Sequence, residues 1–175
     1  MPNKTRVELP TEQPVSAAPC VASHPPNPLT ALPEGALVIV SCTRTKIWAA
    51  YPGAARFVPA CQAYRGSSFL AFMRHLEQQM REGGPDIRWL ILSAKYGYIE
   101  PWQPVDNYDV TFSDPKTGPI SEETLYGQVM YQTRWPDRKR MRDFRAIMYS
   151  GTDIYGERIG LSFRDTDAVI AAIHV

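Results

Sequence analysis

The chain has 175 residues, 44% of them hydrophobic, and 19 Lys and Arg stand against 18 Asp and Glu. A net charge of +1 excludes a protein that is strongly basic or acidic as a whole, so any contact with nucleic acid must come from a local patch. The three cysteines form no C-x-x-C pair, which argues against a disulfide framework and against a zinc site.

The sequence also carries no sign of a membrane or export segment. No apolar run reaches the roughly 18 residues that a membrane span needs, and the N-terminus lacks the basic and apolar segments of a signal peptide. We therefore expect a cytoplasmic protein with reduced thiols and no membrane partner.

Residues 1–34 carry eight of the sixteen prolines and few large apolar groups. Such a segment cannot bury enough surface to offset the entropy lost on ordering. The composition predicts a disordered proline-rich tail over residues 1–34, without fixed contact to the core, and a single domain over residues 35–175. A proline motif that binds a partner is the alternative to a plain tail.

The first half of the domain has the pattern of a βαβ unit. A continuous apolar run at residues 36–40 is typical of a strand buried on both faces, and residues 87–92, apolar except for Arg88, predict a second buried strand. Between them, a loop over residues 48–61 precedes apolar residues at helical spacing, which end at a Gly-Gly-Pro stop: Phe69, Met73, Leu76 and Met80. The two strands are therefore expected to be parallel.

The second half begins with a proline-rich stretch, residues 98–120, which predicts a long ordered loop or flap. Ser121 is expected to cap a helix that runs to about Tyr131. A short basic helix, a third strand, another helix and a last strand follow, at residues 137–143, 145–149, 151–161 and 168–175. The whole pattern predicts an α/β fold, as a single three-layer domain with a mainly parallel sheet.

Small, hydroxyl-bearing and cationic residues follow three of the predicted strands, in segments 41–46, 93–97 and 150–155. Ligands of parallel α/β sheets bind beyond the carboxyl ends of the strands, so we expect a site where these segments meet. Polar loops without a ligand are the alternative. The ligand-binding residues that this reasoning selects are Ser41, Arg44, Lys46, Ser93, Tyr96, Gly97, Ser150 and Tyr155, with Tyr108 from the flap.

Three residues are candidates for catalysis, and we expect them to converge in one cleft with Lys46 and Ser93. Cys42 is a potential nucleophile, but none of the three histidines lies at a predicted strand end, so a buried structural cysteine is the favoured alternative. Lys95 is either a nucleophilic amine or an electrostatic anchor. Asp109 is a candidate for proton transfer or for holding a sugar hydroxyl, with an Asx turn as its structural alternative. The sequence indicates no metal site and no cofactor.

Residues 134–145 form the one locally basic segment. A row of cations with a stacking face suits a phosphate backbone, although a solvated helix face is the commoner meaning of such a run. The predicted nucleic-acid-binding residues are Arg134, Trp135, Arg138, Lys139, Arg140 and Arg142.

Four motifs together resemble a bacterial and phage family of unknown function, which is itself similar to the YaaA-like superfamily of peroxide-stress proteins. A more distant similarity is to the Cys-Ser-x-x-Lys domain of archaeosine synthase, which modifies a base in transfer RNA. The motifs are Ser41-Cys42-x-x-x-Lys46, Ala63-Tyr64-x-Gly66-x-x-Phe69, Leu92-Ser93-Ala94-Lys95-Tyr96-Gly97-x-x-x-Pro101 and Tyr108-Asp109. The resemblance covers residues 36–160, and it adds Tyr64 to the candidate ligand-binding residues. It implies a YaaA-like α/β domain and nucleic-acid or modified-base biology. This chain departs from the family at Arg44, where lysine is common, and at Tyr98, where an aliphatic residue is usual.

The main functional hypothesis is an enzyme that acts on a nucleotide, nucleoside or nucleic-acid base by group transfer or glycosidic-bond chemistry. Its partner would be a nucleotide-like small molecule or a nucleic acid. The alternatives are a non-catalytic nucleic-acid-binding or stress-response protein that uses residues 134–145, and a protein-interaction module that uses the tail.

Overall fold

The computed structural model describes residues 26–175, and the predicted tail lies outside the described residues for positions 1–25. The chain joins the domain earlier than predicted. A 3-10 helix over Pro28–Ala31 buries Leu29, and the Asn27 side-chain amide donates a hydrogen bond to the His75 carbonyl at 2.8 Å. The predicted boundary at residue 35 is therefore too late, because Leu29 and Leu32 pack against the core and dock this segment.

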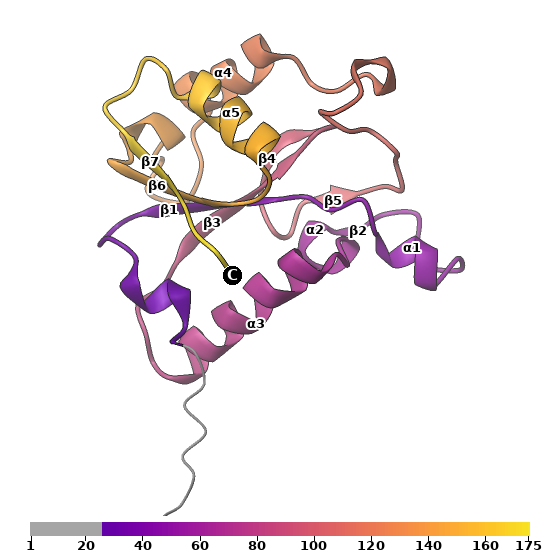
Figure 1. Cartoon of the computed structure of the whole chain (residues 1–175), viewed down its shortest axis with the longest axis horizontal. Coiled ribbons are helices and arrows are strands. Elements are labelled where there is room, and N and C mark those ends of the chain that lie inside the picture. The colour runs from indigo at the N-terminus through magenta and orange to yellow at the C-terminus, as the bar shows by residue number, and fades with distance from the viewer. Residues whose placement is uncertain (1–25) are drawn as a thin grey trace, which may run out of the picture.

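A five-stranded sheet forms the centre of the domain, in the order β4-β3-β1-β6-β7 (Figure 1). Neighbouring strands run parallel except for β4, which is antiparallel to β3. The prediction of an α/β fold with a mainly parallel sheet is thus confirmed. Strand β4 was not predicted, since most of it falls in the stretch 98–120 that was expected to be a loop. The strands are β1 Leu37–Ser41, β3 Arg88–Ser93, β4 Gly97–Ile99, β6 Ala146–Ser150 and β7 Val169–Ala172.

Helices pack on both faces of this sheet. Helix α3 (Ser67–Arg81) lies on one side, whereas α4 (Glu122–Tyr131) and α5 (Asp153–Ser162) lie on the other (Figure 1). Alternate residues of β1 point to the two sides: Val38 and Val40 join the cluster with α3, and Leu37 and Ile39 join the cluster with α4 and α5. The central strand therefore has no free face, which explains its unbroken apolar sequence.

The buried side of α3 differs from the predicted one. Phe69, Phe72, Leu76 and Gln79 face the core, whereas Met80 is 72% exposed. Both sets of positions fit a helical repeat, and the large Phe72 ring decides between them because it packs against Trp89 with ring centroids 5.1 Å apart.

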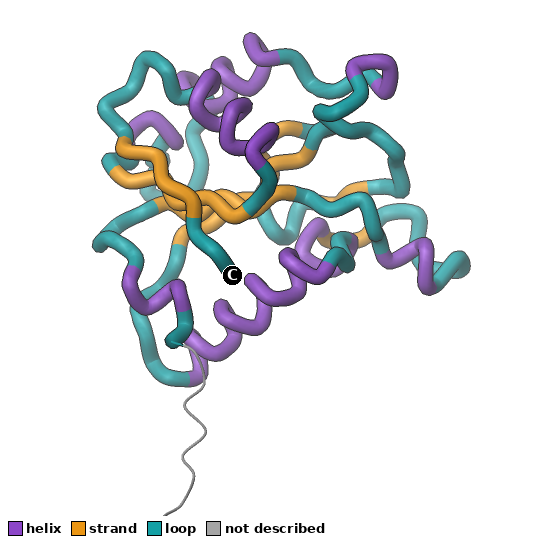
Figure 2. The backbone as a smooth tube through the Cα atoms, in the orientation of Figure 1, coloured by secondary structure: helices purple, strands orange, loops and turns teal. Residues whose placement is uncertain are grey.

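Shorter elements lie beside the carboxyl edge of the sheet. Helix α1 (Ile47–Ala50) and helix α2 (Ala60–Ala63) replace the predicted loop, and β2 (Val58–Pro59) pairs antiparallel with β5 (Pro104–Val105). Figure 2 shows that the chain from β5 to α4 is mostly loop, with one 3-10 turn at Pro115–Thr117, as the predicted flap requires.

The basic segment is not the helix that the sequence suggested. Only Met141–Asp143 is helical, as a 3-10 turn. Trp135 and Arg138 have positive φ angles, near 60°, and this left-handed backbone interrupts a helix before it forms.

Candidate functional site

The three strand ends that were expected to meet lie along one edge of the sheet. Strands β1, β3 and β6 are adjacent and parallel, and they end at Ser41, Ser93 and Ser150. After β6, Gly151 approaches β1 so closely that an added Cβ would lie 2.8 Å from Ser41 Oγ. The close packing of these two chain ends explains why Ser41 is only partly exposed and why position 151 needs a glycine.

A cavity of about 270 Å³ opens at this edge, between the end of β1, the flap and α5. It brings together four predicted ligand-binding or catalytic groups from distant parts of the sequence, together with the exposed side chain of Arg44. Its walls are formed by Cys42, Thr43, Arg44, Lys46, Asp109, Val110, Thr111, Ser113, Asp114, Thr117 and Tyr155.

Cys42 lies in this wall next to a phenol. Its Sγ is 3.1 Å from the Tyr155 hydroxyl, and the residue is only 9% exposed. Burial raises the pKa of Tyr155, so the phenol stays protonated at neutral pH. Within residues 26–175 no histidine or carboxylate forms a hydrogen bond to this sulfur, so the geometry favours the packed cysteine over the nucleophile.

Lys46 lines both this cavity and a neighbouring one. Its Nζ donates to the Tyr108 carbonyl at 2.8 Å and to the Arg44 carbonyl at 3.4 Å, and it lies 4.2 Å from the centre of the Tyr108 ring. Burial lowers the pKa of this ammonium, which is 6% exposed. The second cavity, of about 260 Å³, shares Arg44, Lys46 and Asp109 with the first and adds Trp48, Ala49, Asn107 and Tyr108.

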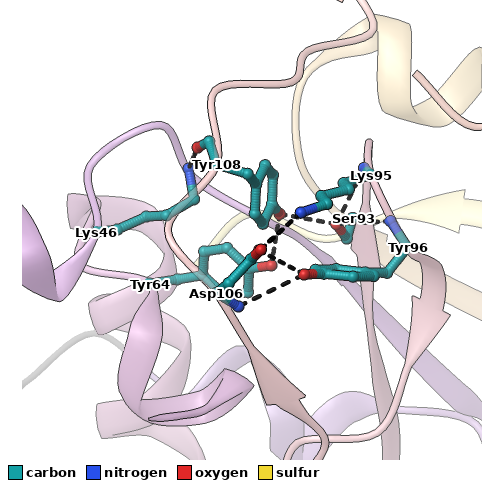
Figure 3. A network of polar contacts seen from close by, with 7 residues as sticks. All are labelled: Lys46, Tyr64, Ser93, Lys95, Tyr96, Asp106 and Tyr108. Atoms are coloured by element: carbon teal, nitrogen blue, oxygen red, sulfur yellow. Dashed lines mark hydrogen bonds and ion pairs between the residues drawn. The ribbon is translucent and has the colours of Figure 1, made fainter. Parts of the chain in front are cut away.

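The hydroxyl groups of Tyr64, Tyr108 and Ser93 form a buried hydrogen-bonded chain (Figure 3). The Tyr108 hydroxyl lies 2.7 Å from Tyr64 Oη and 2.7 Å from Ser93 Oγ. Ser93 Oγ already accepts the backbone N–H groups of Lys95 and Tyr96, both at 3.2 Å, so its own proton is left to donate to Tyr108. Burial raises the pKa of both tyrosines, and the chain therefore consists of neutral hydroxyls that fasten the flap to the end of β3.

Lys95 lines neither cavity. It forms an ion pair with Asp106 (Figure 3). Its Nζ lies 2.8 and 2.9 Å from the two carboxylate oxygens, and the Tyr96 hydroxyl donates to the same carboxylate. The hydrogen bond to Asp106 raises the pKa of Lys95. Such an ammonium is not the desolvated amine of a nucleophilic lysine. The expectation that Lys95 and Ser93 would share the cleft with Cys42, Lys46 and Asp109 is therefore wrong.

Gly97 serves the β3–β4 hairpin. It has a φ of 73° and is buried, and a Cβ at this position would lie 2.2 Å from Gln128 Oε1. That amide side chain bridges the turn and β4, because it accepts from the Tyr98 N–H at 2.8 Å and donates to the Tyr96 carbonyl at 3.2 Å. Ser150 and Tyr64 are likewise buried and line neither cavity, so they pack beneath the site and do not form its wall.

Several residues of the site were not selected from the sequence. Asp106 is the partner of Lys95, and no local pattern indicates this pairing, since the contact joins the turn after β3 to the flap. Thr111, Ser113 and Asp114 line the first cavity, and the Ser, Thr and Asp content of the flap was the available signal.

The basic segment lies at the opposite edge of the sheet, since it leads into the amino end of β6. Arg134 is 6% exposed and donates to the Tyr98 carbonyl at 2.6 Å and to Gln132 Oε1 at 2.7 Å. Trp135 packs on Phe144, and Lys139 lies over the same ring. Arg138 is exposed, whereas Arg140 and Arg142 are half-buried. The segment therefore does not present a continuous row of cations.

Among the described residues, no group of three or more His, Cys, Asp or Glu side chains is placed to hold a metal ion. No helix in residues 26–175 has the length and apolar character that crossing a bilayer requires.

No protein-family model matches the chain. The search of curated proteins found no match. The search of solved structures found none either.

Proposed function

We propose that the protein is an enzyme that acts on a nucleotide, nucleoside or nucleic-acid base at the carboxyl edge of its sheet. The observation that carries this proposal is the wall shared by the two cavities, where Arg44, Lys46 and Asp109 stand together. Two cations suit a phosphate, and a neighbouring carboxylate suits a sugar hydroxyl or a proton in transfer. The YaaA-like relationship and a three-layer architecture are part of the same proposal and rest on the sequence motifs.

The chemistry of the lining supports a small polar ligand. Binding sites for small molecules usually occupy roughly 300–1,000 Å³, and the two adjoining cavities have about 270 and 260 Å³. Thr111 and Ser113 contribute hydroxyls that lie 2.8 Å from each other, and the one that accepts this hydrogen bond keeps its own proton to donate to a phosphate oxygen. In the proposed complex, Arg44 and Lys46 hold the phosphate and Asp109 faces the sugar. Group transfer or cleavage of the glycosidic bond would then occur beside Asp109.

The proposal is tested by calorimetric titration of the purified full chain with nucleoside monophosphates, the matching nucleosides and inorganic phosphate. Monophosphates should bind more tightly than nucleosides, and Arg44→Ala should weaken the monophosphates by about tenfold. Arg74→Ala is the control, since this exposed arginine lies on α3 away from the cavities. If no monophosphate binds, or if Arg44→Ala and Arg74→Ala behave alike, the proposed function is wrong.

A further inference from the structure

The charges of the chain are unevenly distributed around the proposed site. Residues 35–76 contain no Asp or Glu, yet they hold five cations: Arg44, Lys46, Arg56, Arg65 and Arg74. The first four fall in the part that leads from β1 to α3, next to the two cavities. A chain with a net charge of +1 thus has a stretch with no acidic residue beside its candidate site.

The same stretch exposes aromatic rings. Residues 47–57, which we call the α1 lobe, project from the carboxyl edge of the sheet (Figure 1). Tyr51 is 65% exposed and Phe57 is 53% exposed in this lobe. The Arg56 guanidinium lies over the Phe57 ring, 5.1 Å from its centre, so a cation and an aromatic face are presented together.

Internal hydrogen bonds hold the lobe in shape. The Trp48 indole N–H donates to the Ala55 carbonyl at 2.9 Å, and the Ala54 N–H donates to the Tyr51 carbonyl at 3.0 Å. The exposed rings therefore stand on a loop that is closed across its base. Single exposed rings are common on protein surfaces, but two large rings and a cation on one short, constrained loop beside the cavities form the kind of apolar surface that marks an interaction site.

The lobe is continuous with the site. Trp48 and Ala49 form one wall of the cavity of about 260 Å³ whose other wall contains Lys46 and Asp109. Arg65 is exposed near the same loop, since its backbone N–H donates to the Thr45 carbonyl at 2.9 Å. A chain that enters the cavity with one nucleotide would therefore pass over the lobe with the next.

We propose that the α1 lobe binds single-stranded nucleic acid, so that the substrate of the site is one nucleotide within a strand. This inference rests on the proposed function and names its substrate class. Unpaired bases stack on exposed aromatic rings, while arginines neutralise the phosphates between them. A duplex keeps its base faces covered and cannot use Tyr51 and Phe57 in this way. Of the nearby acids, Asp106 is paired with Lys95, whereas Asp109 and Asp114 line the cavities.

The test is fluorescence anisotropy of a labelled 12-residue oligonucleotide titrated with the full chain. Oligo-dT, oligo-U and a duplex of the same length are compared at several salt concentrations. Both single strands should bind more tightly than the duplex, and the preference between them reports the natural sugar. Tyr51→Ala with Phe57→Ala should weaken single-strand binding by about 10- to 100-fold. Arg56→Ala should make the plot of log affinity against log salt less steep by about 0.7.

Matched controls separate this inference from the proposed function. Tyr131→Ala removes a ring that is 68% exposed on α4, across the sheet, and should leave oligonucleotide affinity unchanged. The Tyr51 and Phe57 double variant should keep the affinity of the parent for nucleoside monophosphates. If monophosphates bind but single strands do not, the inference about the lobe is overturned while the proposed function stands. The same holds if the double variant binds single strands as tightly as Tyr131→Ala does. Loss of monophosphate binding in the parent would remove the proposed function itself.

Discussion

Lys46 donates a hydrogen bond to the backbone carbonyl of Tyr108 at 2.8 Å and lies 4.2 Å from the centre of the same residue's ring. One residue therefore joins the end of β1 to the flap and also carries a positive charge into the candidate site. The bond leaves the ammonium with donor capacity beyond the two carbonyls that it contacts, since an ammonium has three N–H groups. In the proposed complex, a phosphate oxygen accepts a hydrogen bond from the remaining N–H group of Lys46.

Replacing Lys46 by methionine tests this assignment. Lys46→Met keeps most of the length of the side chain but removes the charge, so nucleoside monophosphate affinity should fall by about tenfold or more. Calorimetric titration measures the change. Lys116→Met, at an exposed lysine on the 3-10 turn of the flap, is the control and should bind as the parent does. Equal affinities for the two variants would show that Lys46 has no part in binding.

Tyr108→Phe tests the buried hydroxyl chain. The substitution leaves the carbonyl that Lys46 contacts but takes away the hydroxyl between Tyr64 and Ser93. Two buried hydroxyls then lose a partner, and the free energy of unfolding should fall by about 1–3 kcal/mol. Urea denaturation measures it. Tyr131→Phe, at an exposed ring, should change stability by less than about 0.5 kcal/mol. A Tyr108→Phe protein as stable as Tyr131→Phe would mean that the chain does not hold the flap.

Arg134 tests whether the basic segment acts in folding or in nucleic-acid binding. Its guanidinium is buried against the Tyr98 carbonyl and Gln132. Arg134→Met should lower the free energy of unfolding by about 1–3 kcal/mol, since the carbonyl loses a charged donor. Arg138→Ala, at an exposed position of the same segment, should cost less than about 0.5 kcal/mol. Oligonucleotide affinity that falls with Arg138→Ala, measured by anisotropy, would restore the binding role of the segment.

The sheet and the strand ends beside the cavities could be predicted because they depend on patterns that are local in the sequence. An unbroken apolar run predicted β1, a mostly apolar run predicted β3, and polar residues indicated where both strands end. Ser121 caps α4 as expected, since its side chain accepts from the Thr124 N–H at 3.2 Å. Such local signals need no knowledge of the rest of the fold.

The remaining features depend on contacts between distant residues, which no local pattern reports. Asp106 meets Lys95 only because the flap folds back over β3. Leu29 stands among prolines in the sequence, and its buried position in the core forms only when α3 has packed. The choice of Phe72 over Met73 for the core depends on Trp89, a residue of another strand. In each case a tertiary partner decides between options that the sequence leaves equal.

The Lys95–Asp106 pair predicts a specific dependence of stability on pH. Burial opposes the charged form of Asp106, but hydrogen bonds from Lys95 and Tyr96 outweigh it and hold the pKa of this carboxyl below its ordinary value of 3.8. Its contribution is therefore present above that value and is lost as the pH falls through the lower pKa of the folded state. The pKa of Lys95 is raised above 10.5, so its contribution is complete below that value and is lost as the pH rises further.

Asp106→Asn should therefore lower the free energy of unfolding at pH 7 by about 0.5–1 kcal/mol, since the pair is partly exposed. The difference from the parent should shrink towards pH 3 and again above pH 11, where one partner of the pair loses its charge. Urea denaturation at these three pH values measures it. Asp167→Asn breaks the Arg145–Asp167 pair, whose side chains are 81% and 86% exposed, and should leave stability unchanged throughout. An Asp106→Asn deficit that stays constant from pH 3 to pH 11 would show that the lost contact is steric rather than electrostatic.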